Sequence, residues 1–282
     1  MKIWTYYDFI NWIKNGSPSK EIKDVEMLDC NNINIDSIPS DIGRLSNLKE
    51  LNLSFNKLNY IPSEIGQLSK LEILLCNNNN LISLPTEIGE LSNLKILNCN
   101  VNQLNSIPTE IGQLIHLKEL HLSNNELFAI PSELGQAINL KKIILDYNKI
   151  VALPSELGQL IKLEEFSFIN NEIESLPSEY GQLTKLSILN ASDNNLTLLP
   201  SEIGELKNLK YLYLNYNKLI YLPTQINRLK SLIELHVNNN KLFSIPQELA
   251  DLQNIKFLYC ENNAIDSFHA DIYEIDGLQI TY

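Results

Sequence analysis

The sequence predicts an α/β repeat array, a stack of copies of one unit that holds a short strand and a short helical turn. Ten of the eleven prolines recur every 23 residues, from Pro39 to Pro246. In the second copy, Leu51 and Leu53 follow the period-two pattern of a short strand. Residues 62–68, Pro-Ser-Glu-Ile-Gly-Gln-Leu, suit a single helical or 3₁₀ turn that begins at proline. A fixed period of this length indicates an elongated array rather than a compact globule.

A column of asparagines has the same period as the prolines. It consists of Asn56, Asn79, Asn102, Asn125, Asn148, Asn171, Asn194, Asn217, Asn240 and Asn263. An inward-facing asparagine, placed where the chain turns off the strand, can satisfy backbone groups that have no other partner. We expect each one to bind backbone groups of its own coil and of the next coil.

The pattern LxxLxLxxNxL followed by LPxxIGxL resembles the leucine-rich repeat family. It is similar to the 23-residue class found in bacterial and viral proteins and in intracellular Ras-group proteins, and it extends from about residue 25 to the C-terminus. The resemblance implies an α/β solenoid in the form of a horseshoe, with a parallel β-sheet on the concave face. It implies short helical or 3₁₀ turns on the convex face, and a partner held on the concave side.

Two segments are expected along the chain. Residues 1–24 are predicted to form an N-terminal helical cap, and residues 25–282 a leucine-rich repeat domain with eleven repeats and a terminal strand. The cap is predicted from apolar residues at roughly helical spacing that stop before Gly16. These residues are Ile3, Trp4, Tyr7, Ile10 and Ile13. The apolar face would cover the first coil, and the alternative is a helix that docks a partner.

The C-terminal end departs from the repeat. Asn227 and Ala250 stand at the repeat position that holds glycine in the earlier copies. Residues 278–282 resemble a twelfth strand, and this end has no cap comparable to the N-terminal one. An uncovered parallel edge promotes association. Either Tyr273 and Tyr282 shield this edge, or the chain forms a weak homodimer through its C-terminal end.

The net charge of −12 has a largely structural source. An acidic residue stands two residues after nine of the ten recurring prolines, and without these nine charges the net charge is −3. An acid at the start of a helical turn is favoured by the peptide dipoles. The acids are Asp41, Glu64, Glu87, Glu110, Glu133, Glu156, Glu179, Glu202 and Glu248. An acidic chain of this kind argues against nucleic acid as a partner.

The N-terminal segment does not have the pattern of a targeting sequence. Asp8 and Asn11 interrupt its apolar residues, so it lacks the continuous apolar run of a signal peptide. No stretch approaches the roughly 20 apolar residues of a membrane span. We therefore expect a cytoplasmic protein without a membrane span, or one in the host cytoplasm if the chain is an effector.

The repeat does not bring catalytic or metal-binding side chains together. The histidines His121 and His236 are five repeats apart, about 24 Å at about 4.8 Å per strand, so they cannot share a metal or a substrate. The cysteines share one inward slot, where we expect small core residues and no disulfide. They are Cys30, Cys76, Cys99 and Cys260. The sequence therefore predicts no enzyme activity, no metal site and no cofactor.

Side chains that point outward from the strands are not fixed by packing, so they carry the information about binding. An aromatic group in repeats nine to eleven is predicted to be the partner-binding site, because outward aromatics on adjacent strands are typical of protein-binding hot spots. Its members are Tyr211, Tyr213, Tyr216, His236, Phe257 and Tyr259. A secondary partner-binding group is predicted at Ile73, Leu75 and Ile96. The alternative is that the aromatics only stack along the sheet.

These observations predict a non-catalytic protein–protein interaction module that binds a protein partner on its concave face. The first alternative is a host-directed bacterial or viral effector or adaptor that uses the repeats to recruit a target. The second alternative is a structural protein that self-associates. A column of lysines that begins several strands is expected to form a solvated rim; it comprises Lys49, Lys95, Lys118, Lys141, Lys210 and Lys256.

Overall fold

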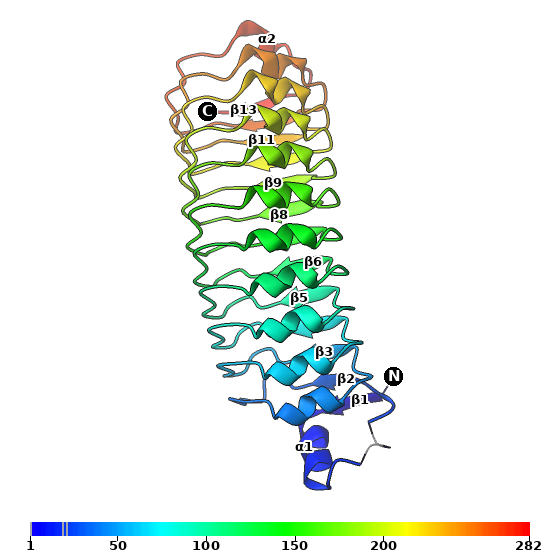
Figure 1. Ribbon diagram of the computed structural model, residues 1–282. Helices are drawn as coiled ribbons and strands as arrows, with labels where there is room; N and C mark the ends of the chain where they lie inside the picture. The colour runs from blue at the N-terminus through cyan, green and yellow to red at the C-terminus, as the bar shows by residue number, and fades with distance from the viewer. Residues whose placement is uncertain (1, 19, 21) are drawn as a thin grey trace. The chain divides into compact units, whose positions relative to one another are not determined.

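Two compact units make up the chain in this computed structural model, which describes residues 2–18, 20 and 22–282. The first unit comprises residues 1–127 and 136–140, and the second comprises residues 128–135 and 141–282. Both units are built from the same coil, in which a short strand is followed by a turn and a short 3₁₀ helix. Within a unit the strands form one row and the short helices another (Figure 1).

The first unit contains six parallel strands that follow one another in chain order. They are β1 (Lys2–Thr5), β2 (Val25–Asp29), β3 (Glu50–Asn52), β4 (Ile73–Leu75), β5 (Ile96–Asn98) and β6 (Glu119–His121). Its helices are α1 (Tyr6–Lys14), η1 (Ser40–Arg44), η2 (Ser63–Gln67), η3 (Thr86–Glu90) and η4 (Thr109–Gln113). The register joins Glu50 to Ile73 and Ile73 to Ile96, so residues 23 apart in sequence lie side by side.

The second unit contains seven parallel strands, also in chain order. They are β7 (Lys142–Ile144), β8 (Glu165–Ser167), β9 (Ile188–Asn190), β10 (Tyr211–Tyr213), β11 (Glu234–His236), β12 (Phe257–Tyr259) and β13 (Gln279–Thr281). Its helices are η6 (Ser155–Gln159), η7 (Ser178–Gln182), η8 (Ser201–Glu205), η9 (Thr224–Arg228), η10 (Gln247–Asp251) and α2 (Ala270–Tyr273). The division between the units falls within η5 (Ser132–Gln136). The predicted fold class, an α/β solenoid of strands and 3₁₀ turns, is confirmed.

The core of each coil is formed by the leucines of the repeat. In β3 the central residue Leu51 is fully buried, whereas Glu50 and Asn52 on either side are half-buried. This alternation recurs in the other three-residue strands except β8, where Ser167 is also buried, and β13, whose outer residues are exposed. It follows from the opposite directions of successive side chains. The surface formed by the outward side chains is called the strand face below. Because the buried leucines hold the coil together, packing leaves the strand face free to vary.

The asparagine column satisfies backbone groups that the coils leave unpaired. Nδ2 of Asn79 donates to the carbonyl oxygens of Cys76 at 3.1 Å and of Leu53 at 2.9 Å. Its Oδ1 accepts from the backbone N–H of Leu58 at 3.0 Å. The predicted contact within the same coil is confirmed, but the second coil that the asparagine binds is the preceding one, not the next. Its side chain therefore joins two coils at once.

Close approach of neighbouring coils explains the glycine column. A Cβ at Gly158 would lie 2.5 Å from the carbonyl oxygen of Glu179 in the next coil, so any side chain would force the coils apart. The proline before a 3₁₀ helix has an extended backbone, as at Pro62 with φ −64° and ψ 147°, and so sets the direction in which the chain enters the helix. At Asn227 the side chain instead donates to Oδ2 of Asp251 at 2.9 Å.

The N-terminal segment forms a strand and then a helix. Strand β1 pairs with β2, so Ile3 and Trp4 lie on a strand rather than on the expected helix. Helix α1 starts at a capping box in which the backbone N–H of Thr5 donates to Oδ2 of Asp8 at 2.8 Å. That bond and the Thr5 hydroxyl lower the pKa of Asp8. The buried apolar side chains of this segment include Trp4, Phe9 and Trp12.

The C-terminal end has exposed aromatic side chains around its last strand. Tyr273 and Tyr282 both contact Phe268, with ring centroids 5.8 and 5.1 Å away, and Phe268 is buried. Strand β13 pairs with β12, and it has no second strand partner among the described residues. The two tyrosines therefore cover Phe268, whereas Gln279 and Thr281 of β13 stay exposed.

Candidate functional site: an aromatic strand face

Strands β10, β11 and β12 place six outward side chains in two rows on the strand face of the second unit. The register aligns Glu234 with Tyr211 on one side and with Phe257 on the other. It aligns His236 in the same way with Tyr213 and Tyr259. All six side chains are half-buried, while the central leucines of these strands are fully buried. The inward core therefore holds the strands, and the outward rows form a separate layer.

Ring contacts connect the aromatic residues of this layer. The imidazole of His236 lies 4.6 Å from the ring of Tyr213 and 4.2 Å from that of Tyr259, measured between centroids. The Tyr211 and Tyr213 rings are parallel at 6.5 Å, and the Phe257 and Tyr259 rings are nearly parallel at 6.1 Å. Five of the six predicted site residues thus form one chain of contacts, called the aromatic layer below.

A carboxylate lies within the aromatic layer. Oε2 of Glu234 is 3.0 Å from Nε2 of His236, and the Glu234 side chain is 26% exposed. Burial raises the pKa of the Tyr213 phenol, and the Glu234 carboxylate raises it further, so Tyr213 stays neutral. The sequence prediction did not include Glu234. The available signal was the spacing Glu-x-His, which places both side chains on the same face of a strand.

Tyr216 lies apart from this layer. It stands three residues beyond β10, in a left-handed backbone conformation with φ 54°, and its side chain is 57% exposed. No ring contact within the described part of the chain joins it to the other predicted residues. The structure therefore places Tyr216 in the turn after the strand, beside the strand face rather than on it.

The secondary apolar group lies on the strand face of the first unit. Register places Ile73 of β4 beside Ile96 of β5, and Leu75 beside Asn98. The three apolar side chains are half-buried. Two strands of aliphatic side chains offer less contact area than the aromatic layer does.

Several lysines of the column form ion pairs near the start of the strands. Nζ of Lys49 lies 3.1 Å from Oε1 of Glu26, and Nζ of Lys95 lies 2.6 Å from Oε2 of Glu72. Exposed pairs of this kind contribute little to stability. They agree with the expected solvated rim.

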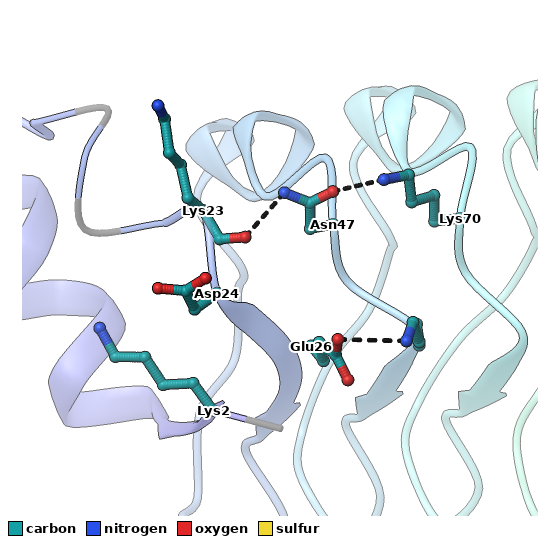
Figure 2. Close-up of a pocket in the computed structure, with 7 residues that line it drawn as sticks. Lys2, Lys23, Asp24, Glu26, Asn47 and Lys70 are labelled. Atoms are coloured by element: carbon teal, nitrogen blue, oxygen red, sulfur yellow. Dashed lines mark hydrogen bonds and ion pairs between the residues drawn. The ribbon is translucent and has the colours of Figure 1, made fainter.

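A surface cavity of about 600 Å³ in the first unit is lined by Lys2, Lys23, Asp24, Glu26, Asn47, Lys49 and Lys70. Figure 2 shows how its polar groups are paired. Nδ2 of Asn47 donates to the carbonyl oxygen of Lys23 at 2.9 Å, and Nζ of Lys70 donates to Oδ1 of Asn47 at 2.6 Å. Charges of both signs line the cavity, and Nζ of Lys49 pairs with Oε1 of Glu26 at 3.1 Å.

The thiols lie in the core. Burial raises the pKa of Cys30 and of Cys260 to about 12 in each case, with a smaller effect from a neighbouring acid. The sulfur atoms of Cys76 and Cys99 are 2.9 Å apart as free thiols, and this contact raises the pKa of Cys99. Within residues 2–18, 20 and 22–282, no three His, Cys, Asp or Glu side chains are grouped to hold a metal ion.

No helix in the described part of the chain has the length and apolar composition needed to cross a membrane.

Comparison with known proteins supports the repeat assignment. Two protein-family models match the chain. The family model described as a leucine-rich repeat region matches residues 23–126, and the one described as a leucine-rich repeat matches residues 116–137 and 185–206. No curated protein matches the chain.

Several solved structures are similar to this chain. A leucine-rich repeat protein of Leptospira interrogans is 33% identical with a TM-score of 0.58, and the match covers 93% of this chain and 85% of that one. A TDR receptor is 30% identical with a TM-score of 0.84, over 100% of this chain and 50% of the receptor chain. The ectodomain of the plant membrane receptor kinase GASSHO1/SCHENGEN3 from Arabidopsis thaliana, in complex with CASPARIAN STRIP INTEGRITY FACTOR 2, is 28% identical with a TM-score of 0.78. That match covers 94% of this chain and 36% of the ectodomain.

The family models and the Leptospira interrogans structure agree with the coil geometry described above. The chain belongs to the leucine-rich repeat family.

Proposed function

We propose that the chain is a non-catalytic protein-interaction module whose strand face binds a protein partner, with the aromatic layer of β10–β12 as the main anchor. The observation that carries the proposal is the continuous ring contact from Tyr211 through His236 to Phe257, outside a core that is already closed by buried leucines. Rings that the core does not require are available to bury against a partner.

The comparison with solved structures supports a protein or peptide as the bound molecule. The Arabidopsis thaliana ectodomain was solved in complex with CASPARIAN STRIP INTEGRITY FACTOR 2. A stack of coils also keeps the outward side chains at fixed spacing, so little ordering is required on binding. The smaller group of Ile73, Leu75 and Ile96 is proposed as a second contact with the same partner.

Affinity capture from the native cell tests the anchor. The variant Tyr213→Ala/Tyr259→Ala removes two rings of the aromatic layer, and we expect it to lose the partner that the unmodified chain captures. The matched control is Tyr60→Ala/Tyr221→Ala, which removes two exposed tyrosines that are not on a strand. Equal capture by both variants would show that the aromatic layer is not the anchor.

Two other candidate functions have observations in their favour. Self-association through the C-terminal end is favoured by the exposed strand β13 and the exposed Tyr282. Analytical ultracentrifugation tests it, and a monomer at all concentrations would exclude it. We also propose, as an alternative, a host-directed bacterial or viral effector or adaptor that uses the repeats to recruit a target; the similar Leptospira interrogans chain is a leucine-rich repeat protein of a bacterium. A secretion assay in the native organism tests that role.

We also propose a cytoplasmic location, because four buried cysteines are free thiols. Fractionation of the native cell tests the location.

A further inference from the structure

We infer that the aromatic layer is a cation-binding slot, in which Glu234 receives an arginine side chain of the partner between the rings of Tyr211 and Phe257. The inference rests on the proposed function, and it names the chemical group that this same surface recognises. The slot lies in the first row of outward side chains, which consists of Tyr211, Glu234 and Phe257. The second row consists of Tyr213, His236 and Tyr259. In the second row a ring fills every position, whereas in the first row a carboxylate stands between two rings.

The spacing of the strands brings both rings close to any cation bound at Glu234. Neighbouring strands are about 4.8 Å apart, so Tyr211 and Phe257 each stand about that distance to one side of Glu234. A cation is attracted to an aromatic face within about 6 Å of the ring centroid. A cation at the Glu234 carboxylate can therefore be close enough to contact both rings.

The contact with His236 orients the Glu234 carboxylate and leaves one of its oxygens able to accept a hydrogen bond from a ligand. Oε2 of Glu234 is occupied by His236 at 3.0 Å, and Oε1 has no hydrogen-bond partner among the described residues. The Glu234 side chain is still accessible to solvent. A planar guanidinium donates to carboxylate oxygens and also stacks on aromatic faces, so it satisfies both features of the slot.

Charges of both signs surround the Glu234 carboxylate, so the charges nearest to a bound group decide between a cation and an anion. Lys210 and Lys256 stand at the start of β10 and β12, one residue before Tyr211 and Phe257. An anion near these lysines would still meet the Glu234 carboxylate and the negative faces of the rings. A glutamate peptide is therefore included in the test as the opposing probe.

The chain contains a matched control for this slot. On β6, Nε2 of His121 lies 3.1 Å from Oε2 of Glu119, which repeats the Glu-x-His pair. Its neighbours on β5 are Ile96 and Asn98, so the carboxylate there has no aromatic ring on that side. If a carboxylate alone were enough, both pairs would bind a cation equally.

Aromatic-region NMR of the whole chain, titrated with peptides, tests the inference. The probe is acetyl-Gly-Ser-Arg-Ser-Gly-amide, compared with the same peptide carrying citrulline, the neutral isostere, or glutamate in place of arginine. We expect shifts of the Tyr211 and Phe257 rings and a dissociation constant at least about fivefold lower for arginine than for citrulline, because charge-assisted bonds and cation–π contacts are lost. Equal binding of arginine and citrulline, or tighter binding of glutamate, would overturn the inference.

Two variants and one control variant locate the effect. Glu234→Gln should weaken arginine binding at least about fivefold, and Phe257→Leu, which keeps an apolar side chain, should weaken it about threefold. Glu119→Gln should leave it unchanged. An equal effect of Glu119→Gln and Glu234→Gln, in variants with unchanged amide spectra, would contradict the slot.

Failure of this inference is distinguishable from failure of the proposed function. If the Tyr213→Ala/Tyr259→Ala variant loses its partner while Glu234→Gln keeps it, the aromatic layer is the anchor and the cation slot is wrong. If the double variant keeps its partner, the anchor itself is wrong, whatever the peptides show.

Discussion

Nε2 of His236 lies 3.0 Å from Oε2 of Glu234, and the same imidazole is stacked on Tyr259 with centroids 4.2 Å apart. The contact with Glu234 fixes the position of a carboxylate, and the contacts with Tyr259 and Tyr213 join two strands through one ring. His236 is therefore the connection between the charged and the aromatic parts of the strand face.

Replacing His236 should disconnect the aromatic layer. We expect His236→Ala to lower the free energy of unfolding by about 1 kcal/mol, because it removes two ring pairs. The ring signals of Tyr213 and Tyr259 should shift in NMR spectra. The control is His121→Ala, whose neighbour on β5 is Asn98 rather than a ring. An equal loss of stability in both variants, measured by urea denaturation, would mean that the ring contacts contribute nothing.

The asparagine ladder should be a main source of stability between coils. Asn79→Ala removes one donor from each of two carbonyl oxygens and the acceptor of the buried Leu58 N–H, so we expect a loss of about 1–3 kcal/mol. The control is Asn59→Ala at an exposed position of the preceding coil. Urea denaturation of the two variants checks the prediction, which fails if they lose the same small amount.

Val101 should be a position where stability can be increased. It is a β-branched residue held at φ 56°, a conformation that Asn124 adopts in the next coil at φ 56°. The left-handed region costs most residues about 1–2 kcal/mol and is tolerated by asparagine. Since Val101 is 43% exposed, little apolar burial is lost in Val101→Asn, and we expect a gain of about 1 kcal/mol.

The reverse change, Asn124→Val, should lower stability by a similar amount. Thermal denaturation of both variants provides the comparison. Destabilisation in both cases would show that the left-handed strain is not the controlling factor at these positions.

The cysteines should be unreactive in the folded chain. Burial raises the pKa of Cys30 and Cys260 to about 12, so both thiols stay protonated at pH 8. We expect fewer than about one thiol per chain to react with a disulfide reagent at pH 8, and all four after unfolding.

The same thiols should make the fold sensitive to high pH. Because the folded-state pKa is above the unfolded value, the stabilisation is complete below about pH 9 and is lost as the pH rises toward about 12. Denaturation at pH 8 and pH 11 tests this, and equal stability at both would contradict it.

The repeat itself was predictable from the sequence because each of its columns has one physical task. Leu51 fills the core, Asn79 pairs backbone groups, and Gly158 allows the next coil to approach. These requirements recur every 23 residues, so the sequence alone reveals the residues that meet them. The prediction that Asn79 binds the next coil is wrong, because the repeat period alone does not show whether a side chain reaches the preceding coil or the following one.

Other features depend on contacts that sequence spacing does not reveal. Trp4 falls at helical spacing with Tyr7, yet strand pairing with β2 places Trp4 in a strand and leaves Tyr7 exposed on the helix. Tyr216 is close in sequence to Tyr213, but the left-handed turn after β10 directs it away from the strand. Glu234 was overlooked because its importance comes from the two rings that stand beside it on other strands.

Site-specific photo-crosslinking tests the central claim most directly. The photoreactive residue benzoylphenylalanine is placed at Tyr213 in one chain and at the exposed Tyr60 in another, and both are irradiated in the native cell. Binding through the aromatic layer predicts a discrete crosslinked protein at Tyr213 and none at Tyr60. Crosslinks at Tyr60 with none at Tyr213 would contradict it.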